Sequence, residues 1–249
     1  MPVLSPPENT ADSGLPDSPL HGFRGERQAE QDRLVLPLAL TVAVSRETGS
    51  RGIVIARQTA KKLGWAFYDQ ERLEYLAEQE HLQGELVGAL DEAQRQWIET
   101  RLKGLDLIDA RSEQDSVRRL ARVVLALGVR GETVILGRGA GCILPSESTL
   151  YVRVVAPVTD RIAFLTQLER LTPAQAKEQV AARDKRRAEF VAHHFRRMAA
   201  DVCQFDLLLN SSKLGEDASI QVVVAAARLK AAAWTTRRSA ATERLLGTE

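Results

Sequence analysis

Short apolar runs alternate along the chain with longer stretches in which apolar residues recur every three or four positions. Residues 38–44 are an apolar run that ends in polar residues, a pattern typical of a strand buried on both faces. Similar runs predict strands at residues 133–136, 150–155 and 205–209. Because strands that alternate with helices form βαβ units, the pattern predicts an α/β fold of three layers, with helices flanking a central, mostly parallel sheet.

The stretches with helical periodicity supply the helices between these strands. Residues 53–63 predict a helix that ends at Gly64, since glycine commonly follows the last helical residue. Residues 172–175, Thr-Pro-Ala-Gln, have the order of a capped N-terminus and begin a long charged helix, and residues 220–230 predict a closing helix. Two further helix faces are marked by apolar residues: Leu86, Leu90, Ala93 and Trp97 in the first, and Val117, Leu120, Val124 and Leu127 in the second, which a capping-box-like sequence at residues 112–115 precedes.

The first 33 residues differ from the rest of the chain because they are polar, rich in proline and without a periodic apolar pattern. Such a segment cannot bury enough apolar surface to offset the entropy lost on ordering. We therefore predict a disordered tail at residues 1–33, a folded domain at residues 34–232 and a C-terminal tail at residues 233–249.

The bulk composition is that of an ordinary globular protein, with 44% hydrophobic and 27% charged residues. A formal net charge of +1 gives no global attraction to nucleic acid or to an acidic membrane, so any anion site must be local. The longest apolar stretch, residues 34–44, is too short to cross a bilayer, and the N-terminus lacks the pattern of a secretory signal. Cys142 and Cys203 lack the spacing of a metal site or a disulfide framework. We expect a cytoplasmic protein that binds neither nucleic acid nor membrane.

Two polar segments that follow predicted strands are the places to look for chemistry, because ligands bind beyond the carboxyl ends of parallel strands. In residues 45–52, a turn containing Gly49 leads from a strand into a helix, which points backbone N–H groups and the positive helix end at one spot. Arg46 and Arg51 can add positive charge there. The same residues are also explained by a tight strand-to-helix turn that binds nothing.

Two further arginine clusters suggest phosphate contacts. Arg138 lies between two glycines after a predicted strand and could bind a phosphate through two parallel N–H hydrogen bonds. Arg183, Arg186 and Arg187 are three and four residues apart, so they share one helix face and could close over a polyphosphate. The alternatives are an arginine in a surface turn and a solvated helix face balanced by nearby acidic residues. The segments alone leave both alternatives open.

Four stretches, taken in their order along the chain, carry a resemblance to a known family. They are residues 41–52 (TVAVSRETGSRG), 61–69 (KKLGWAFYD), 134–140 (VILGRGA) and 183–210, which begin RDKRRAEF and end FDLLLN. In this order they resemble the cytidylate kinase-like family of the P-loop nucleoside monophosphate kinase superfamily. The resemblance implies a P-loop kinase-like fold, with a helical acceptor-binding insertion at about residues 70–115 and an arginine-rich lid at about residues 173–200.

The same resemblance implies ATP-dependent phosphorylation of a nucleoside monophosphate, with CMP or dCMP as the first expectation and ATP and Mg²⁺ as cofactors. The residues it assigns are Arg46, Gly49, Ser50, Arg51 and Gly52 on the donor phosphates, Asp69 and Arg138 on the acceptor, and Arg51, Arg183, Arg186 and Arg187 as catalytic cations. No residue is assigned as a metal ligand. Nucleotides are the expected partners, and a monomer or weak homodimer is the expected state.

The segment departs from the standard loop G-x-x-x-x-G-K-[ST] at the residues that bind phosphate and Mg²⁺. Gly52 stands where that loop has its phosphate-binding lysine, and Ile53 and Val54 follow where a hydroxyl residue is expected on Mg²⁺. These departures leave two alternatives open. One is a nucleotide-binding pseudokinase or interaction protein without turnover, and the other is a kinase for a different small-molecule acceptor.

Overall fold

The computed structural model describes residues 36–105, 113–198 and 200–246. The tail predicted for residues 1–33 lies outside these ranges, and so does Ser112, the first residue of the predicted capping-box-like sequence.

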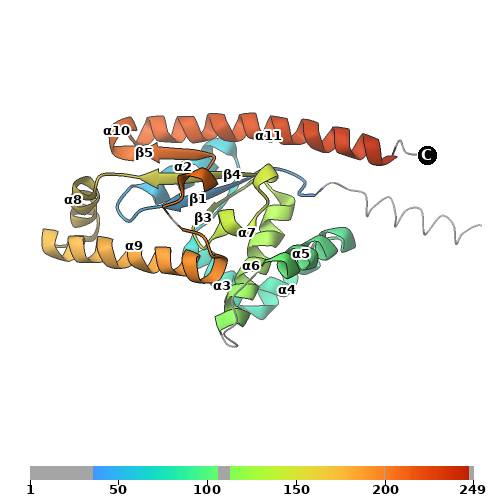
Figure 1. Ribbon diagram of the computed structural model, residues 1–249, viewed down its shortest axis with the longest axis horizontal. Coiled ribbons are helices and arrows are strands. Elements are labelled where there is room, and N and C mark those ends of the chain that lie inside the picture. Colours follow the sequence, from blue (N-terminus) through green and yellow to red (C-terminus); the bar gives the residue numbers. More distant parts are fainter. Residues whose placement is uncertain (1–35, 106–112, 199, 247–249) are drawn as a thin grey trace, which may run out of the picture. The chain divides into compact units, whose positions relative to one another are not determined.

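One sheet of five parallel strands runs through the described part of the chain, in the order β2-β3-β1-β4-β5 (Figure 1). The strands are β1 (Thr41–Arg46), β2 (Ala66–Tyr68), β3 (Thr133–Leu136), β4 (Thr149–Val155) and β5 (Leu207–Asn210). β1 lies in the centre between β3 and β4, so the loops that follow these three strands emerge at one edge of the sheet. The predicted α/β class with a central parallel sheet is confirmed.

Helices cover both faces of this sheet (Figure 1). They are α2 (Gly52–Leu63), α3 (Gln70–Glu78), α4 (Glu80–Gly88), α5 (Glu92–Gly104), α6 (Glu113–Arg130), α7 (Ala140–Ile143), α8 (Val158–Glu169), α9 (Pro173–Phe195), α10 (Ser211–Leu214) and α11 (Glu216–Leu246). Successive side chains of β1 alternate between the two faces. Val42 and Val44 pack in the core with α2 and α11, whereas Ala43 belongs to the core around α6. The apolar run therefore becomes a strand buried on both faces, as predicted.

α6 forms the centre of the core that contains Ala43. The predicted inward residues Val117, Leu120, Val124 and Leu127 are all buried, with exposures between 0% and 6%. Other residues of the helix are buried as well, namely Ala121, Val123, Leu125, Ala126 and Val129. α3, α4 and α5 pack against α6 from outside, so this helix is covered on more than the single face that its periodicity predicts.

The region between residues 80 and 104 forms two helices, whereas the spacing of Leu86, Leu90, Ala93 and Trp97 predicts one. The Asp91 side chain accepts a hydrogen bond from the Gln94 N–H at 2.8 Å, and the Gln94 side chain accepts one from the Asp91 N–H at 3.2 Å. This capping box begins α5 and leaves Leu90 buried in the connection. The prediction of one helix is wrong because local capping ends the periodic segment.

The C-terminal helix is longer than predicted. The sequence predicts a helix at residues 220–230 and a tail from residue 233, whereas α11 continues to Leu246. The Trp234 ring is buried, and its Nε1 donates a hydrogen bond to the Pro37 carbonyl at 3.1 Å, which holds the helix in place beyond the predicted end. Within the residues described, no helix combines the length and the apolar character needed to cross a membrane.

α8 and α9 pack as a pair around a small core of their own, formed by Leu165, Ala176 and Val180. α9 begins as predicted, because the Thr172 hydroxyl accepts from the Gln175 N–H and the Gln175 side chain accepts from the Thr172 N–H. This pair carries the arginines of the predicted lid.

Candidate functional site

A cleft of about 1170 Å³ lies at the carboxyl ends of β1, β3 and β4. Its walls come from the loop after β1, the residues after β3, and helices α8 and α9. The predicted site residues that line it are Arg46, Gly49, Arg51, Gly52, Asp69, Arg138, Arg183, Arg186 and Arg187. Ser50 is the exception among the predicted residues, because its side chain is buried. The fold thus brings widely separated segments of the chain to one cavity.

The loop after β1 has the backbone of an anion site. Gly49 has a φ of 81° and Arg51 a φ of 60°, both in the left-handed region, and the chain enters α2 at Gly52. Within the described ranges, the N–H groups of Gly49, Arg51 and Gly52 have no hydrogen-bond acceptor. Free N–H groups at a helix N-terminus attract anions, because the helix dipole adds positive charge at the same place.

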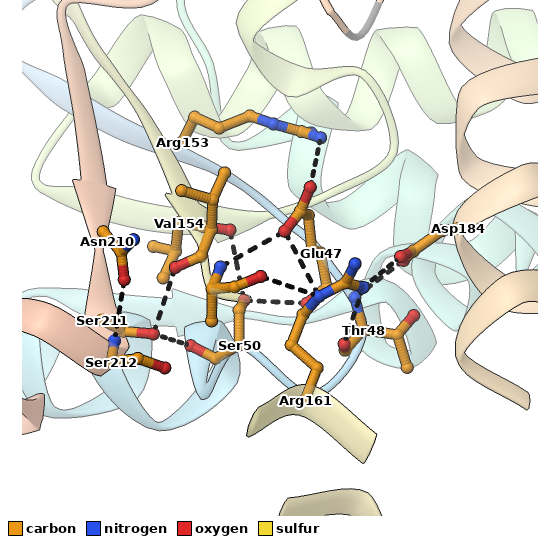
Figure 2. A network of polar contacts seen from close by, with 12 residues as sticks. Glu47, Thr48, Ser50, Arg153, Val154, Arg161, Asp184, Asn210, Ser211 and Ser212 are labelled. Carbon is orange, nitrogen blue, oxygen red and sulfur yellow. Dashed lines mark hydrogen bonds and ion pairs between the residues drawn. The ribbon is translucent and has the colours of Figure 1, made fainter. Parts of the chain in front are cut away.

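The buried Ser50 side chain is turned toward the Val154 carbonyl (Figure 2), and Ser50 does not line the cleft. Its hydroxyl lies 2.8 Å from the Glu47 carbonyl and 3.2 Å from the Val154 carbonyl. Ser211, at the start of α10, donates to the Ser50 carbonyl at 2.8 Å and ties the loop to the end of β5. The Ser50 hydroxyl therefore supports the shape of the loop, and its orientation does not favour the predicted contact with donor phosphates.

Replacing Ser50 by alanine should lower the free energy of unfolding by about 1 kcal/mol, because the Glu47 and Val154 carbonyls lose the hydroxyl and each keep one backbone N–H donor. The affinity for ATP should change by about twofold at most, since the hydroxyl does not face the cleft. Urea denaturation and calorimetric titration measure the two effects. Ser212→Ala is the control, because the buried Ser212 hydroxyl has no hydrogen-bond partner among the residues described. A Ser50 variant of unchanged stability and much weaker ATP binding would contradict this reading.

Arg161 of α8 links the loop to the helix pair (Figure 2). Its side chain is 11% exposed and lies between two carboxylates, with 3.4 Å to Glu47 and 2.5 Å to Asp184. It also donates to the Thr48 carbonyl at 3.3 Å. A cation this buried is stable only with such partners, so the three side chains hold α8, α9 and the loop together.

Asp184 of α9 also contacts the loop directly. Its carboxylate accepts a hydrogen bond from the Thr48 N–H at 2.7 Å. Arg187 donates to the Thr48 hydroxyl at 2.6 Å and lies 3.5 Å from Asp184. A carboxylate that accepts from a loop N–H occupies the place of an anionic ligand, so α9 rests on the predicted phosphate-binding loop.

The guanidinium groups of Arg46, Arg138 and Arg187 line the same cleft. Burial and the charges of Arg187 and Arg138 lower the pKa of Arg46 to about 9. Burial and the Arg187 charge lower the pKa of Arg138, and burial lowers the pKa of Arg187. An anion placed among these groups would stabilise all three, because desolvated like charges destabilise one another.

Arg138 follows β3 in a left-handed conformation, with a φ of 52°. Its guanidinium is paired with Glu74 of α3 and lies 5.1 Å from the centre of the Phe190 ring of α9. Its Nε has no hydrogen-bond partner among the described residues. Arg138 is thus held between α3 and α9 with donor capacity left for a ligand.

Asp69, the second predicted acceptor residue, caps the start of α3. One carboxylate oxygen accepts from the Arg72 N–H at 3.1 Å, and the other lies 3.8 Å from Arg57. The same side chain lines the cleft, so the cap and the predicted acceptor contact share one carboxylate.

The remaining predicted arginines make different contacts. Arg183 forms two hydrogen bonds with Glu169 of α8, at 2.6 and 2.9 Å, and these bonds raise its pKa. Arg51 lies over the Phe164 ring of α8, 4.7 Å from its centre. Arg186 is exposed at the cleft. Arg183 therefore joins α8 to α9, and Arg51 braces α8 against the loop.

The residues present fit a polyphosphate but not the loop-bound Mg²⁺ of the standard motif. In the ranges that the structure describes, no group of three His, Cys, Asp or Glu side chains could hold a metal ion. Mg²⁺ takes oxygen ligands, but the Ser50 hydroxyl is turned inward and neither Ile53 nor Val54, which follow Gly52, has a side-chain oxygen. The loop therefore lacks the hydroxyl ligand that the motif supplies.

Three residues that join the loop to the helix pair are not among the predicted site residues: Glu47, Arg161 and Asp184. Glu47 and Asp184 directly follow the predicted residues Arg46 and Arg183. An acidic side chain next to a predicted site arginine is a sequence feature that could have identified both as site residues. Arg161 has no such signal, because its nearest ionic partner along the chain is 23 residues away.

Comparison with known proteins gives one family and several similar structures. The model of the cytidylate kinase-like family matches residues 41–213. None of the curated proteins matches the sequence. An uncharacterized protein from Eubacterium ventriosum ATCC 27560 is 17% identical, with a TM-score of 0.53 over 76% of this chain and 98% of that one. This likeness supports the fold.

Two other solved structures are less similar. Shikimate kinase from Bacteroides thetaiotaomicron is 13% identical, with a TM-score of 0.41 over 74% of this chain and 96% of that one. TT1252 from Thermus thermophilus is 19% identical, with a TM-score of 0.42 over 77% of this chain and 98% of that one.

Proposed function

The chain belongs to the cytidylate kinase-like family, and on that premise we propose that it transfers a phosphoryl group from ATP to a small phosphorylated acceptor. CMP and dCMP are the first acceptors to test, because the resemblance to cytidylate kinases names them. Enzymes of this kind work by positioning the reactants and neutralising their charge, without a covalent intermediate on the protein.

One observation carries the proposal: cations gather in the cleft beside free backbone N–H groups. Arg46, Arg138 and Arg187 come from β1, the end of β3 and α9, and each has a lowered pKa with burial as the largest cause. Cations kept together at such a cost are typical of a site that binds a highly charged anion. A polyphosphate beside a second phosphate fits that description.

The loop N–H groups and two of the arginines have distinct roles in this proposal. The N–H groups of Gly49, Arg51 and Gly52 bind the donor phosphates, which carry the transferable phosphoryl group. Arg138, set between α3 and α9, orients the phosphate of the acceptor. Arg187, already on the loop, neutralises charge between the two, while the α8–α9 pair excludes water from the cleft.

A nucleotide-binding protein without turnover is the second candidate, and two observations favour it. The inward Ser50 hydroxyl and the apolar Ile53 and Val54 leave the loop without the hydroxyl ligand for Mg²⁺ that the standard motif supplies. The Asp184 carboxylate accepts from the Thr48 N–H, so a side chain of the protein competes with any anion at that position.

The test measures ADP release and ligand binding in parallel. The purified chain is incubated with ATP, Mg²⁺ and one nucleoside monophosphate at a time, and each ligand is titrated calorimetrically. We expect ADP release with CMP or dCMP above the other acceptors. Arg138→Met should raise the acceptor KM about tenfold while leaving the ATP affinity within about twofold, as expected for one charged hydrogen bond. ATP binding without ADP release would favour the second candidate, and no nucleotide binding at all would refute both.

A further inference from the structure

Arg46 is a largely buried cation of the cleft. Among the residues described, it has neither an ion pair nor a hydrogen bond, although burial lowers its pKa to about 9. Arg138 is paired with Glu74 and Arg187 lies 3.5 Å from Asp184, whereas Asp184 and Asp69 act on Arg46 only from a distance and raise its pKa by less than burial and the two cations lower it. Because these carboxylates do not offset burial and the neighbouring cations, an anion bound in the cleft would stabilise the charge of Arg46.

The path of the Arg46 side chain is fixed by two glycines. A Cβ atom on Gly52 would lie 2.5 Å from the Arg46 Cβ and 3.0 Å from its Cγ. A Cβ atom on Gly137 would collide with the Arg46 guanidinium. The stem of Arg46 thus crosses the start of α2, and its head lies against the turn after β3. The contact at Gly52 requires a residue without a side chain because it involves the Arg46 stem, whereas the contact at Gly137 involves only the flexible end of Arg46.

Gly52 is needed for this space and not for its backbone conformation. Unlike Gly49 and Gly137, it is not among the residues with positive φ. An L-residue could therefore adopt the backbone at this position, and only the Arg46 side chain excludes one.

The positions of the two residues match two positions of the standard loop. In G-x-x-x-x-G-K-[ST], the first glycine and the lysine are six positions apart. Arg46 and Gly52 are also six positions apart, with Gly52 at the lysine position. In this chain Arg46 therefore stands at the position of the first glycine of the motif, and Gly52 stands at the position of its lysine. The cation and the glycine have exchanged places.

We propose that Arg46, at the end of β1, replaces the missing lysine and binds the β- and γ-phosphates of a nucleoside triphosphate. Gly52 provides the space for the aliphatic part of the Arg46 side chain. This inference rests on the proposed function, since it assigns the donor-phosphate cation of that site. It also assigns a smaller role to Arg51, whose guanidinium lies over the Phe164 ring.

Calorimetric titration with ATP and with inorganic tripolyphosphate tests the assignment. Arg46→Met keeps the length of the side chain and removes the charge, so both affinities should fall about ten- to a hundredfold, the range for one charged contact. The Tm should stay the same or rise, because one of three mutually repelling cations is gone. A purely structural arginine would lower the Tm and leave the affinity alone. Arg228→Met, at an exposed position of α11, is the control for the loss of one positive charge.

Variants that return the glycine to position 46 and a lysine to position 52 test the exchange through their affinity for ATP and tripolyphosphate. Gly52→Lys alone should weaken binding, because its Cβ meets Arg46, and Arg46→Gly alone should weaken it through loss of the cation. The double variant Arg46→Gly/Gly52→Lys restores the order of the standard motif and should recover binding to within about threefold of wild type. A double variant as weak as the single ones would overturn the exchange.

The remaining outcomes separate this inference from the proposed function. If wild type binds ATP and Arg46→Met binds it equally well, the role of Arg46 is refuted and the kinase proposal stands. If wild type binds neither ATP nor tripolyphosphate, the donor site is refuted and the inference falls with it.

Discussion

Replacing Gly49 by alanine is expected to lower the free energy of unfolding by about 3 kcal/mol and to abolish measurable ATP binding. Gly49 has a φ of 81°, which costs an L-residue of the order of 1–2 kcal/mol. Its Cβ would also lie closer than 3.0 Å to the Arg161 backbone carbonyl, and such overpacking costs about 1–3 kcal/mol more. The loop would have to move away from α8, which would displace the N–H groups that face the cleft.

Gly64 offers a matched control for this prediction. It has a similar φ of 73°, but a Cβ there would meet nothing within 4 Å. Gly64→Ala should therefore show only the conformational cost, about 1–2 kcal/mol, with ATP binding unchanged. Urea denaturation of both variants gives the difference. Equal losses at the two positions would mean that the close approach to α8 does not constrain the loop.

The Asp184→Asn variant is expected to change stability and anion affinity in opposite directions. The Asp184 carboxylate accepts from the Thr48 N–H at 2.7 Å and pairs with Arg161 at 2.5 Å. Loss of its charge should lower the free energy of unfolding by about 2 kcal/mol, since hydrogen bonds to charged groups are worth about 1.5–3 kcal/mol. It should also raise the affinity for tripolyphosphate about tenfold, because Arg161 and Arg187 lose a competing anion.

Thermal denaturation, calorimetry and hydrogen exchange across α8 and α9 measure these effects. Faster exchange in α9 is expected if Asp184 holds it on the loop. Glu178→Gln is the control, since Glu178 is an exposed carboxylate of the same helix that does not line the cleft. Weaker tripolyphosphate binding by Asp184→Asn would show that the carboxylate positions the arginines and does not compete with the ligand.

Local sequence patterns were sufficient for most of the scaffold. The apolar run at residues 38–44 predicted the buried central strand, and Gly64 marked the end of α2. Thr172 and Gln175 marked the start of α9. These features depend on alternation, periodicity and capping, which act between residues a few positions apart and can be read directly from the order of residues.

The same rules also explain where the sequence misled. Periodicity joined α4 and α5 into one helix, although Asp91 and Gln94 form a cap that separates them. The end of α11 was placed too early because Trp234 is anchored by Pro37, 197 residues away. In each case a polar contact outweighed the apolar pattern, and only the first contact was local.

The sequence by itself determined the class of the fold and the segments that line the cleft, because both follow from the burial pattern and from the position of loops after parallel strands. The tertiary structure decided which polar groups in those segments face a ligand. The Ser50 hydroxyl was turned inward by the Val154 carbonyl, 104 residues away, and the Thr48 N–H was bound by Asp184, 136 residues away. Arg46 was placed in the cleft by the space at Gly52 and Gly137. The direction of a polar side chain depends on the partners that the whole fold brings within about 3 Å, and local sequence carries little information about those partners.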